Sequence, residues 1–211
     1  MNFYDPRHTP NSSGTLHKWD NETANCGMGA IANLNGEKSY QIIDYAITSV
    51  CNMTHRGAVD ADGKTGDGAG IHLEIPKDFF IEKIEVTGHE HDNSEICVGM
   101  IFLPRNDYSA QESCKTIVES ELTKNNFSIY GWRQVPVNPK ILGQKALQTM
   151  PEIIQVLFKS NDQNLLDKHL ERKIYETRKK IEKKAFQLSL NNFYICSISS
   201  KSIIYKGLYL A

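Results

Sequence analysis

The sequence has 211 residues, and its 24 Lys and Arg residues nearly balance its 25 Asp and Glu residues, for a formal net charge of −1. Apolar residues make up 40 % of the chain and charged residues 23 %, which is typical of a globular protein and not of a disordered one. The balanced charge is not that of a typical nucleic-acid-binding protein, and no apolar run approaches the ~20 residues of a membrane span. We therefore expect neither nucleic acid nor a membrane among the partners, and a length that suits one domain or a little more.

Residues 1–25 differ from the rest of the chain in composition. They are polar, rich in turn-forming residues, and they lack the apolar stretch of a secretory signal. The acidic residues Asp5, Asp20 and Glu22 also argue against an organellar transit peptide. We interpret residues 1–25 as a leader or propeptide, and residues 26–211 as the folded part.

The five cysteines point to a reducing compartment. Their number is odd and they contain no CxxC pair, so they match neither a zinc ribbon nor a disulfide framework. A cytoplasmic location is the simplest interpretation. The cysteines are Cys26, Cys51, Cys97, Cys114 and Cys196.

The first predicted elements follow the leader. Small and apolar residues over 26–34 predict a strand that ends at the turn Asn35–Gly36. Ser39 is a suitable N-cap, and apolar residues at helical spacing after it predict a helix over 39–54.

A Gly- and Asp-rich loop over 55–70 separates this helix from the next strand. In 71–75, Ile and Leu alternate with His and Glu, which predicts a half-buried strand, and Pro76 ends it. The continuous apolar run over 96–104 is typical of a strand that is covered on both faces. Helical spacing returns over 110–122.

The last third of the chain alternates between extended and helical patterns. Two prolines within 131–139 favour an extended segment, and 153–158 is another apolar run. The strongest helix covers 163–185, with one apolar stripe and a basic opposite face. Two strands over 193–207 are close enough to form a hairpin with its turn at 199–201. Strands and helices come in blocks, so the fold class is α+β.

Several polar patterns suggest binding sites but fit a structural role better. The cluster 89–91 (His-Glu-His) lies in a polar loop without a third metal ligand at a recognisable spacing, and Cys51 and His55 form only a pair. The segment 60–71 begins like a calcium loop but lacks the required Gly and Glu. The glycines of 66–70 lack a P-loop Lys and precede a strand, so they favour close backbone approach over phosphate binding. We expect no metal site.

Cys26 is the one cysteine whose position suggests catalysis. An internal cysteine near a strand is usually a small core residue. However, the segment before it is a candidate for removal, and Gly27 and Gly29 leave its surroundings uncrowded. If the leader were cleaved, Cys26 would carry a free α-amine with an ordinary pKa of about 7.7–8.0, which suits a general base beside a thiol nucleophile. N-terminal-nucleophile hydrolases work in this way.

Residues 26–211 resemble the beginning of the mature large subunit of the glutamate synthase family. The resemblance is carried by CG at 26–27, HRGA at 55–58, TGDGAG at 65–70 and later segments. The later segments are VGMIFLP, GWRQVPV, LERKIYETRKK and FYICSISSKSIIYKG. The resemblance implies a class II glutamine amidotransferase domain with a four-layer αββα N-terminal-nucleophile fold. It also implies hydrolysis of L-glutamine to glutamate and ammonia.

The same resemblance assigns roles to five residues. Cys26 would be the catalytic nucleophile, freed by removal of residues 1–25, and would form a glutamyl thioester. Arg56 and Gly57 match the family's Arg-Gly pair beside the nucleophile and would shape the site or bind substrate. Asp67 and Gly68 lie in the matching loop, with a weaker link to function. A purely structural role for Arg56, as an anchor of the loop, stays open.

The family pattern continues beyond Ala211, into an Arg that binds the substrate carboxylate and an Asn-Gly pair that forms the oxyanion hole. We therefore expect this chain to be an incomplete domain, which leaves its activity in isolation open. In the full-length enzyme the ammonia would serve glutamate formation from 2-oxoglutarate. FMN and an iron–sulfur cluster would belong to downstream synthase domains, with a small subunit or ferredoxin as electron donor, and this chain itself would hold no cofactor.

Two alternatives remain. The chain could be a non-catalytic amidotransferase-like module for binding or assembly. It could also be another class II amidotransferase with a different ammonia acceptor, although the segment LERKIYETRKK resembles glutamate synthase in particular.

Overall fold

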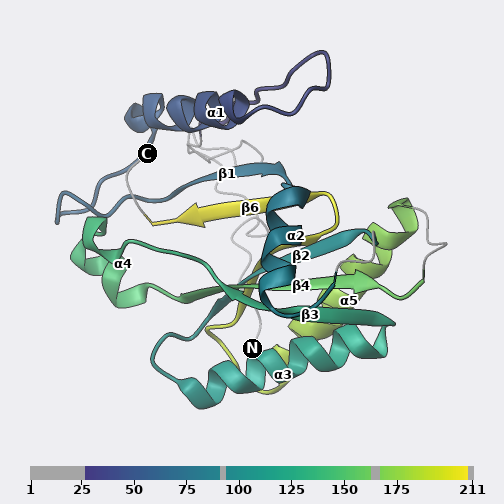
Figure 1. Cartoon of the computed structure of the whole chain (residues 1–211). Coiled ribbons are helices and arrows are strands. Elements are labelled where there is room, and N and C mark those ends of the chain that lie inside the picture. Colours follow the sequence, from purple (N-terminus) through teal and green to yellow (C-terminus); the bar gives the residue numbers. More distant parts are fainter. Residues whose placement is uncertain (1–26, 91–93, 163–166, 209–211) are drawn as a thin grey trace, which may run out of the picture.

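The computed structural model describes residues 27–90, 94–162 and 167–208, except for the side chains of Arg56 and Asp167. These ranges hold five α-helices, two short 3₁₀ turns and six strands (Figure 1). In chain order they are α1 (Tyr40–Asn52), η2 (Thr54–Arg56), β1 (Ala69–Glu74), α2 (Lys77–Val86), β2 (Ile96–Leu103), α3 (Tyr108–Lys124), β3 (Phe127–Gln134), η3 (Pro139–Ile141), α4 (Gln144–Thr149), β4 (Glu152–Ser160), α5 (Asp167–Gln187), β5 (Tyr194–Ser199) and β6 (Ser202–Gly207).

The strands form two antiparallel sheets. One has four strands in the order β3-β4-β2-β5, and the other pairs β1 with β6. In β2 every residue is buried except Phe102, which is half-buried. Both faces of an inner strand with this pattern must be covered, as the apolar run predicts.

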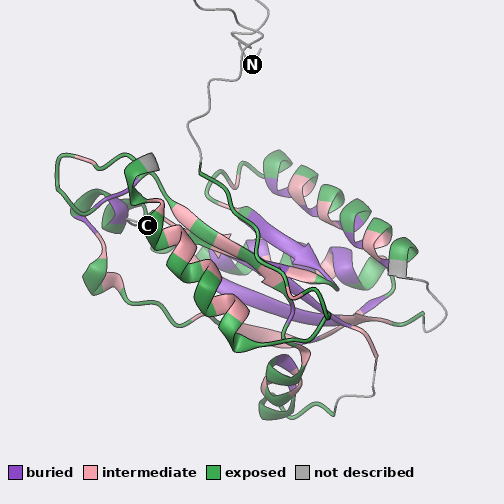
Figure 2. Ribbon diagram, turned by 90° about the horizontal axis from the view of Figure 1, so that it is seen from above, coloured by how far each residue is buried: buried purple, intermediate pink, exposed green. Residues whose placement is uncertain are grey.

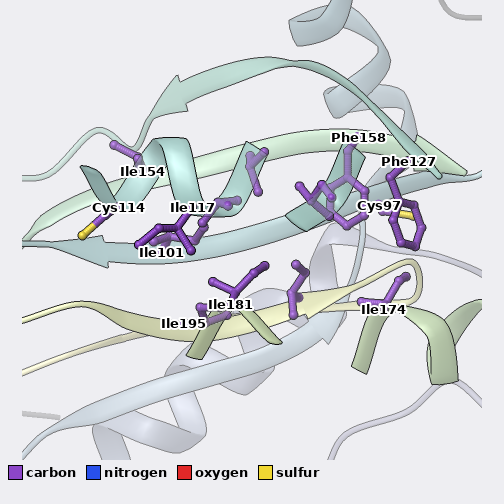
Figure 3. Close-up of a cluster of buried hydrophobic side chains, with 14 of the residues drawn as sticks. Cys97, Ile101, Cys114, Ile117, Phe127, Ile154, Phe158, Ile174, Ile181 and Ile195 are labelled. Carbon is purple, nitrogen blue, oxygen red and sulfur yellow. The ribbon is translucent and has the colours of Figure 1, made fainter. Parts of the chain in front are cut away.

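The main hydrophobic core lies between the four-stranded sheet and helices α3 and α5 (Figure 3). The rings of Phe127 and Phe158 meet edge to face, with centroids 5.3 Å apart. Ile101 from β2 and Ile174 from α5 are fully buried in the same cluster. Since both helices bury an apolar stripe here, the other face of the sheet is left for a second core.

The second core lies between the two sheets and is closed by α2. It contains Phe80 and Ile84 of α2, Met100 of β2, and Ile203 of β6, all of which are buried. Helix α1 lies over the two-stranded sheet, on the side away from the four-stranded sheet (Figure 1). None of its residues is buried (Figure 2).

The structure confirms most of the predicted elements and the α+β class. Helix α1 begins after Ser39, whose side chain accepts a hydrogen bond from the amide of Gln41. The half-buried strand is β1, and the long basic helix is α5, although its expected first residues 163–166 lie outside the described ranges. Within the described ranges no helix is both long and apolar enough to cross a membrane.

The strand predicted over 26–34 is wrong. Cys26 lies outside the described residues, and residues 27–33 form no regular element before the turn at Leu34 and Asn35. Met28 and Leu34 are 92 % and 100 % exposed, so these apolar side chains do not pack against a sheet. A strand requires a neighbour that accepts its backbone hydrogen bonds, and none of the described strands takes that place.

The hairpin predicted over 193–207 is also wrong, although both strands exist. β5 pairs with β2 and β6 pairs with β1, so the turn at Ser200 and Lys201 carries the chain from one sheet to the other. The two strands contact through side chains: the amide of Ile204 donates to Ser197 Oγ at 3.2 Å. The carboxylate of Glu171 accepts hydrogen bonds from Ser199 Oγ, Ser200 Oγ and the amide of Ser200, which stabilises the turn.

Candidate functional site

Four of the five residues assigned to the site, Arg56, Gly57, Asp67 and Gly68, lie at the two ends of the loop between η2 and β1. The nucleophile candidate, Cys26, and the side chain of Arg56 lie outside the described parts. The backbone of Arg56 ends η2, so Gly57 follows at once. Asp67 and Gly68 come just before β1. The structure therefore describes both ends of the loop and three of the five assigned residues, Gly57, Asp67 and Gly68.

The two ends of the loop run antiparallel and hold each other. The amide of Asp67 donates to the carbonyl of Ala58 at 3.2 Å, and Val59 forms a bridge with Gly66. A Cβ at Gly57 would lie 3.2 Å from Asp67 Oδ1, so the Asp67 carboxylate rests against the Gly57 backbone. Gly57 and Asp67, ten residues apart in sequence, are thus neighbours in space.

Gly68 is a position that needs glycine. Its φ of +117° is a backbone conformation that residues with a Cβ rarely adopt. A Cβ would also lie 3.2 Å from the carbonyl oxygen of Gly207, at the end of β6. The loop base is therefore fitted closely against the two-stranded sheet.

A cleft of about 2810 Å³ opens beside the loop base. Gly27, the residue next to Cys26, lines it together with Gly57, Asp67 and Gly68. Apolar side chains of α1 line another part of its wall, among them Ile43. Three of the five assigned residues therefore line the cleft, and the other two, Cys26 and Arg56, are each next in sequence to a residue that does.

The tip of the same loop is held by α4, a contact that the sequence did not predict. Asp62 Oδ1 accepts hydrogen bonds from the amides of Lys64 and Thr65 at 2.9 and 2.7 Å, and Thr65 Oγ1 donates to Asp62 Oδ2 at 2.6 Å. The hydroxyl and amide of Thr65 hold the pKa of Asp62 well below its usual range. Lys145 Nζ forms an ion pair with Asp60 Oδ2 at 2.5 Å, and this contact lowers the pKa of Asp60 as well.

The remaining cysteines are poor candidates for a nucleophile. Cys97, Cys114 and Cys196 are buried, and burial raises the pKa of each thiol, to about 11 for Cys114. A thiol in this state carries almost no thiolate at neutral pH. Cys51 on α1 is exposed, which makes it a useful control.

The His-Glu-His cluster lies at the end of the first described range. His91 falls outside the described ranges. His89 Nδ1 lies 3.1 Å from Thr87 Oγ1, and its ring meets Tyr130 edge to face. Across residues 27–90, 94–162 and 167–208, no three His, Cys, Asp or Glu side chains gather as a metal site would require.

The comparison with known protein families bears on the whole folded part. The family model described as "Glutamine amidotransferases class-II" matches residues 26–211. The chain belongs to the class II glutamine amidotransferases. The match begins at Cys26 itself, the residue that the sequence singles out.

Known proteins similar to this chain include several glutamate synthases. The chain is 46 % identical over 186 residues to the glutamate synthase [NADPH] large chain of Azospirillum brasilense, which covers 88 % of this chain and 12 % of that protein. It is 40 % identical to the ferredoxin-dependent glutamate synthase of Antithamnion sp., over 87 % of this chain and 12 % of that protein. The chloroplastic ferredoxin-dependent enzyme of Spinacia oleracea is 35 % identical, over 95 % and 13 %.

The chain thus spans about an eighth of the length of these relatives. The matched region corresponds to the amidotransferase part of the family, and the expected resemblance to glutamate synthase is confirmed.

Proposed function

We propose that this chain is the glutamine-hydrolysing part of a glutamate synthase, with Cys26 as its nucleophile. The Cys26 thiolate attacks the side-chain amide carbon of L-glutamine, and the carbon–nitrogen bond breaks as ammonia takes up a proton. The α-amine of Cys26, free once residues 1–25 are removed, carries the proton from the thiol to the departing nitrogen. Water then hydrolyses the thioester, which releases glutamate and restores the thiol.

One observation carries this proposal. The family match starts at Cys26, and Gly27 lines the same cleft as Gly57, Asp67 and Gly68. A nucleophile at the first residue of a domain needs an open approach for its substrate. The cleft beside Gly27 supports that geometry.

Four loop residues complete the proposed site. Arg56 directly precedes Gly57 in the chain, and a cation at this position would favour the thiolate form of a cysteine or help to shape the site. At Gly57 the lack of a side chain lets the Asp67 carboxylate lie against the backbone, and at Gly68 it lets the backbone lie close to the carbonyl of Gly207. We assign these four to binding and shaping, and only Cys26 to catalysis.

The arrangement of layers supports a four-layer αββα N-terminal-nucleophile fold for the whole domain. Helix α1 covers the two-stranded sheet, that sheet packs on the four-stranded sheet, and α3 and α5 cover the far face (Figure 1).

The rest of the proposed pathway lies outside the matched region. In the complete enzyme, the ammonia would be used to form glutamate from 2-oxoglutarate, with FMN and an iron–sulfur cluster in synthase domains beyond it. The names of the relatives include both NADPH and ferredoxin. The electron donor of the complete enzyme would therefore be either ferredoxin or a small subunit that uses NADPH. A reducing compartment such as the cytoplasm would keep the Cys26 thiol active.

The test uses the complete polypeptide that the gene encodes. N-terminal sequencing of active protein should begin at Cys26, and a diazoketone analogue of glutamine should add one equivalent of mass to it. Replacing Cys26 with Ser should abolish both labelling and ammonia release, whereas Cys51→Ser should change neither, since Cys51 is an exposed cysteine outside the site.

Active protein that retains Met1, or full activity in Cys26→Ala, would refute the mechanism. Absence of labelling and of ammonia release in the correctly cleaved protein would favour a non-catalytic amidotransferase-like module instead.

A further inference from the structure

The loop that carries the assigned site is held at its tip by a helix that is distant in sequence. Helix α4 has Gly143 at its N-cap, which provides no side-chain cap. Its second and third amides instead point at the loop: Lys145 N lies 3.5 Å from Asp62 Oδ2, and Ala146 N lies 3.4 Å from Thr65 Oγ1. The loop thus caps α4 from more than 80 residues away.

The fit between the loop tip and α4 leaves no spare room. A Cβ on Gly143 would overlap Thr65 Oγ1 and Asp62 Oδ2, and would lie 2.6 Å from the Thr65 amide nitrogen. The ion pair between Asp60 and Lys145 closes the contact on its exposed side. Thr65 is buried in this contact although most of the loop around it is exposed.

The contact connects the loop to the four-stranded sheet. Only two residues separate α4 from β4, an inner strand of the four-stranded sheet, hydrogen-bonded to β2 and β3. On the loop side, Thr65 O accepts the amide of Asp60 at 2.8 Å, and Asp67 follows two residues later. A shift of Thr65 therefore moves Asp67 and its partner Gly57.

We propose that Asp62 and Thr65 are positioning residues: by capping α4 they fix the loop base, and so place Gly57, Asp67 and Gly68 at the cleft. Neither residue lines the cleft. The inference rests on the proposed function, because what the loop base positions is the glutamine site. We call the contact of Asp62 and Thr65 with Gly143, Lys145 and Ala146 the loop–α4 latch.

The test compares two substitutions of Thr65. Thr65→Val keeps the shape but removes the hydroxyl, so both the Asp62 carboxylate and the Ala146 amide lose a partner. Thr65→Ser retains the hydroxyl and should behave like the wild type. A matched control is Asp107→Ala, which removes the cap of α3, where Asp107 Oδ1 accepts the Ala110 amide at 2.9 Å. That cap is of the same kind but does not touch the loop.

Two readouts are needed, both on the complete polypeptide. Amide hydrogen exchange over 57–68 should accelerate roughly fivefold in Thr65→Val, the factor that corresponds to loss of a typical helix cap, and stay at the wild-type rate in Thr65→Ser and Asp107→Ala. In steady-state glutamine hydrolysis, Thr65→Val should raise KM by roughly fivefold with a smaller change in kcat, because a displaced loop base weakens binding before it affects the nucleophile.

A third variant tests the same contact without removing any polar group. In Gly143→Ala the added Cβ should push the loop away from α4. This variant should therefore show the same faster exchange over 57–68 and the same rise in KM as Thr65→Val.

The latch is refuted if exchange over 57–68 is unchanged in Thr65→Val, or if Asp107→Ala accelerates it equally. Accelerated exchange with an unchanged KM would refute the positioning role. If the wild type releases no ammonia, the proposed function fails, while the exchange data still decide whether the latch exists.

Discussion

The two sides of this molecule are packed to very different degrees. Between the four-stranded sheet and helices α3 and α5, the core is continuous, and Phe127, Phe158 and Ile174 are almost wholly shielded from solvent (Figure 3). On the other side, α1 has no buried residue and borders the large cleft. Several apolar side chains there are exposed, such as Leu34 and Tyr40.

The difference separates the scaffold from the surface where the site lies. The well-packed side supplies stability, because burial of apolar area is the main favourable contribution to folding. The open side carries the cleft and the loop residues of the proposed site. We therefore expect substitutions to act mainly on stability on the first side, and mainly on local structure on the second.

The largest effect is expected in the main core. Phe158→Ala should lower the free energy of unfolding by about 3–5 kcal/mol, because a fully buried aromatic side chain leaves a cavity and its edge-to-face partner Phe127 loses its contact. The measurement is denaturant-induced unfolding followed by circular dichroism. Phe186→Ala is the matched control: Phe186 lies at the end of α5 and is 76 % exposed, so its loss should change stability by less than ~0.5 kcal/mol. Equal losses of stability in Phe158→Ala and Phe186→Ala would contradict the view that the buried core supplies the stability.

A smaller effect is expected at the polar contact between α3 and α5. Glu121 is buried on α3 and accepts ion pairs from Lys184 of α5 and from Lys124. Glu121→Gln should cost about 1–2 kcal/mol at pH 7, typical of losing a charged hydrogen bond whose cationic partners are partly exposed. Glu112→Gln, on the same helix but 70 % exposed and paired with Lys115, should cost almost nothing.

The cost of Glu121→Gln should depend on pH. The hydrogen bond from Lys184 holds the pKa of Glu121 below its ordinary value. A carboxyl with a lowered pKa in the folded state contributes fully above its unfolded pKa of about 4.3, and loses that contribution as pH falls toward the folded pKa. The difference between wild type and Glu121→Gln should therefore be constant from pH 7 to about 5 and shrink below about 4. A difference that grows on acidification would contradict this assignment.

The elements that were predictable from sequence are those with a strong local pattern. The apolar run of β2, the Ser39 cap of α1 and the apolar stripe of α5 each determine an element from neighbouring residues. Helix α2 was missed because it is short and follows Pro76, although Phe80 and Ile84 are four apart on its buried face. Short helices depend on tertiary packing more than on their own propensity.

Pairing between strands was less predictable. Nothing in the spacing of β5 and β6 distinguishes a hairpin from two strands that enter different sheets, because the choice depends on β2 and β1, which are distant in sequence. The same limit applies to the candidate site. Glycines 57 and 68 and Asp67 could be assigned by resemblance, but the contact of Asp62 with Lys145 spans 83 residues, and no local pattern in the sequence indicated it.

On the open side, truncation of a half-buried residue should cost less than in the core. Ile43 of α1 is only half-buried, and Ile43→Ala should lower the free energy of unfolding by about 0.5–1 kcal/mol, below the 2–5 kcal/mol usual for a buried isoleucine. Ile101→Ala in β2 provides that comparison within the same protein, since Ile101 is fully buried. Denaturant-induced unfolding of the two variants measures both losses in the free energy of unfolding. A loss for Ile43→Ala close to that for Ile101→Ala would show that α1 is packed as tightly as the main core.

The smallest effect on stability is expected at Leu34, beside the N-terminal end of α1. Its side chain is 100 % exposed, so Leu34→Ser removes no packing and should change the free energy of unfolding by less than ~0.5 kcal/mol. Denaturant-induced unfolding followed by circular dichroism measures this. Leu103→Ser, at a buried position of β2, makes the same chemical change and should destabilise strongly. A large stability loss in Leu34→Ser would mean that this residue is covered in solution, and the division between a packed and an open side would then have to be redrawn.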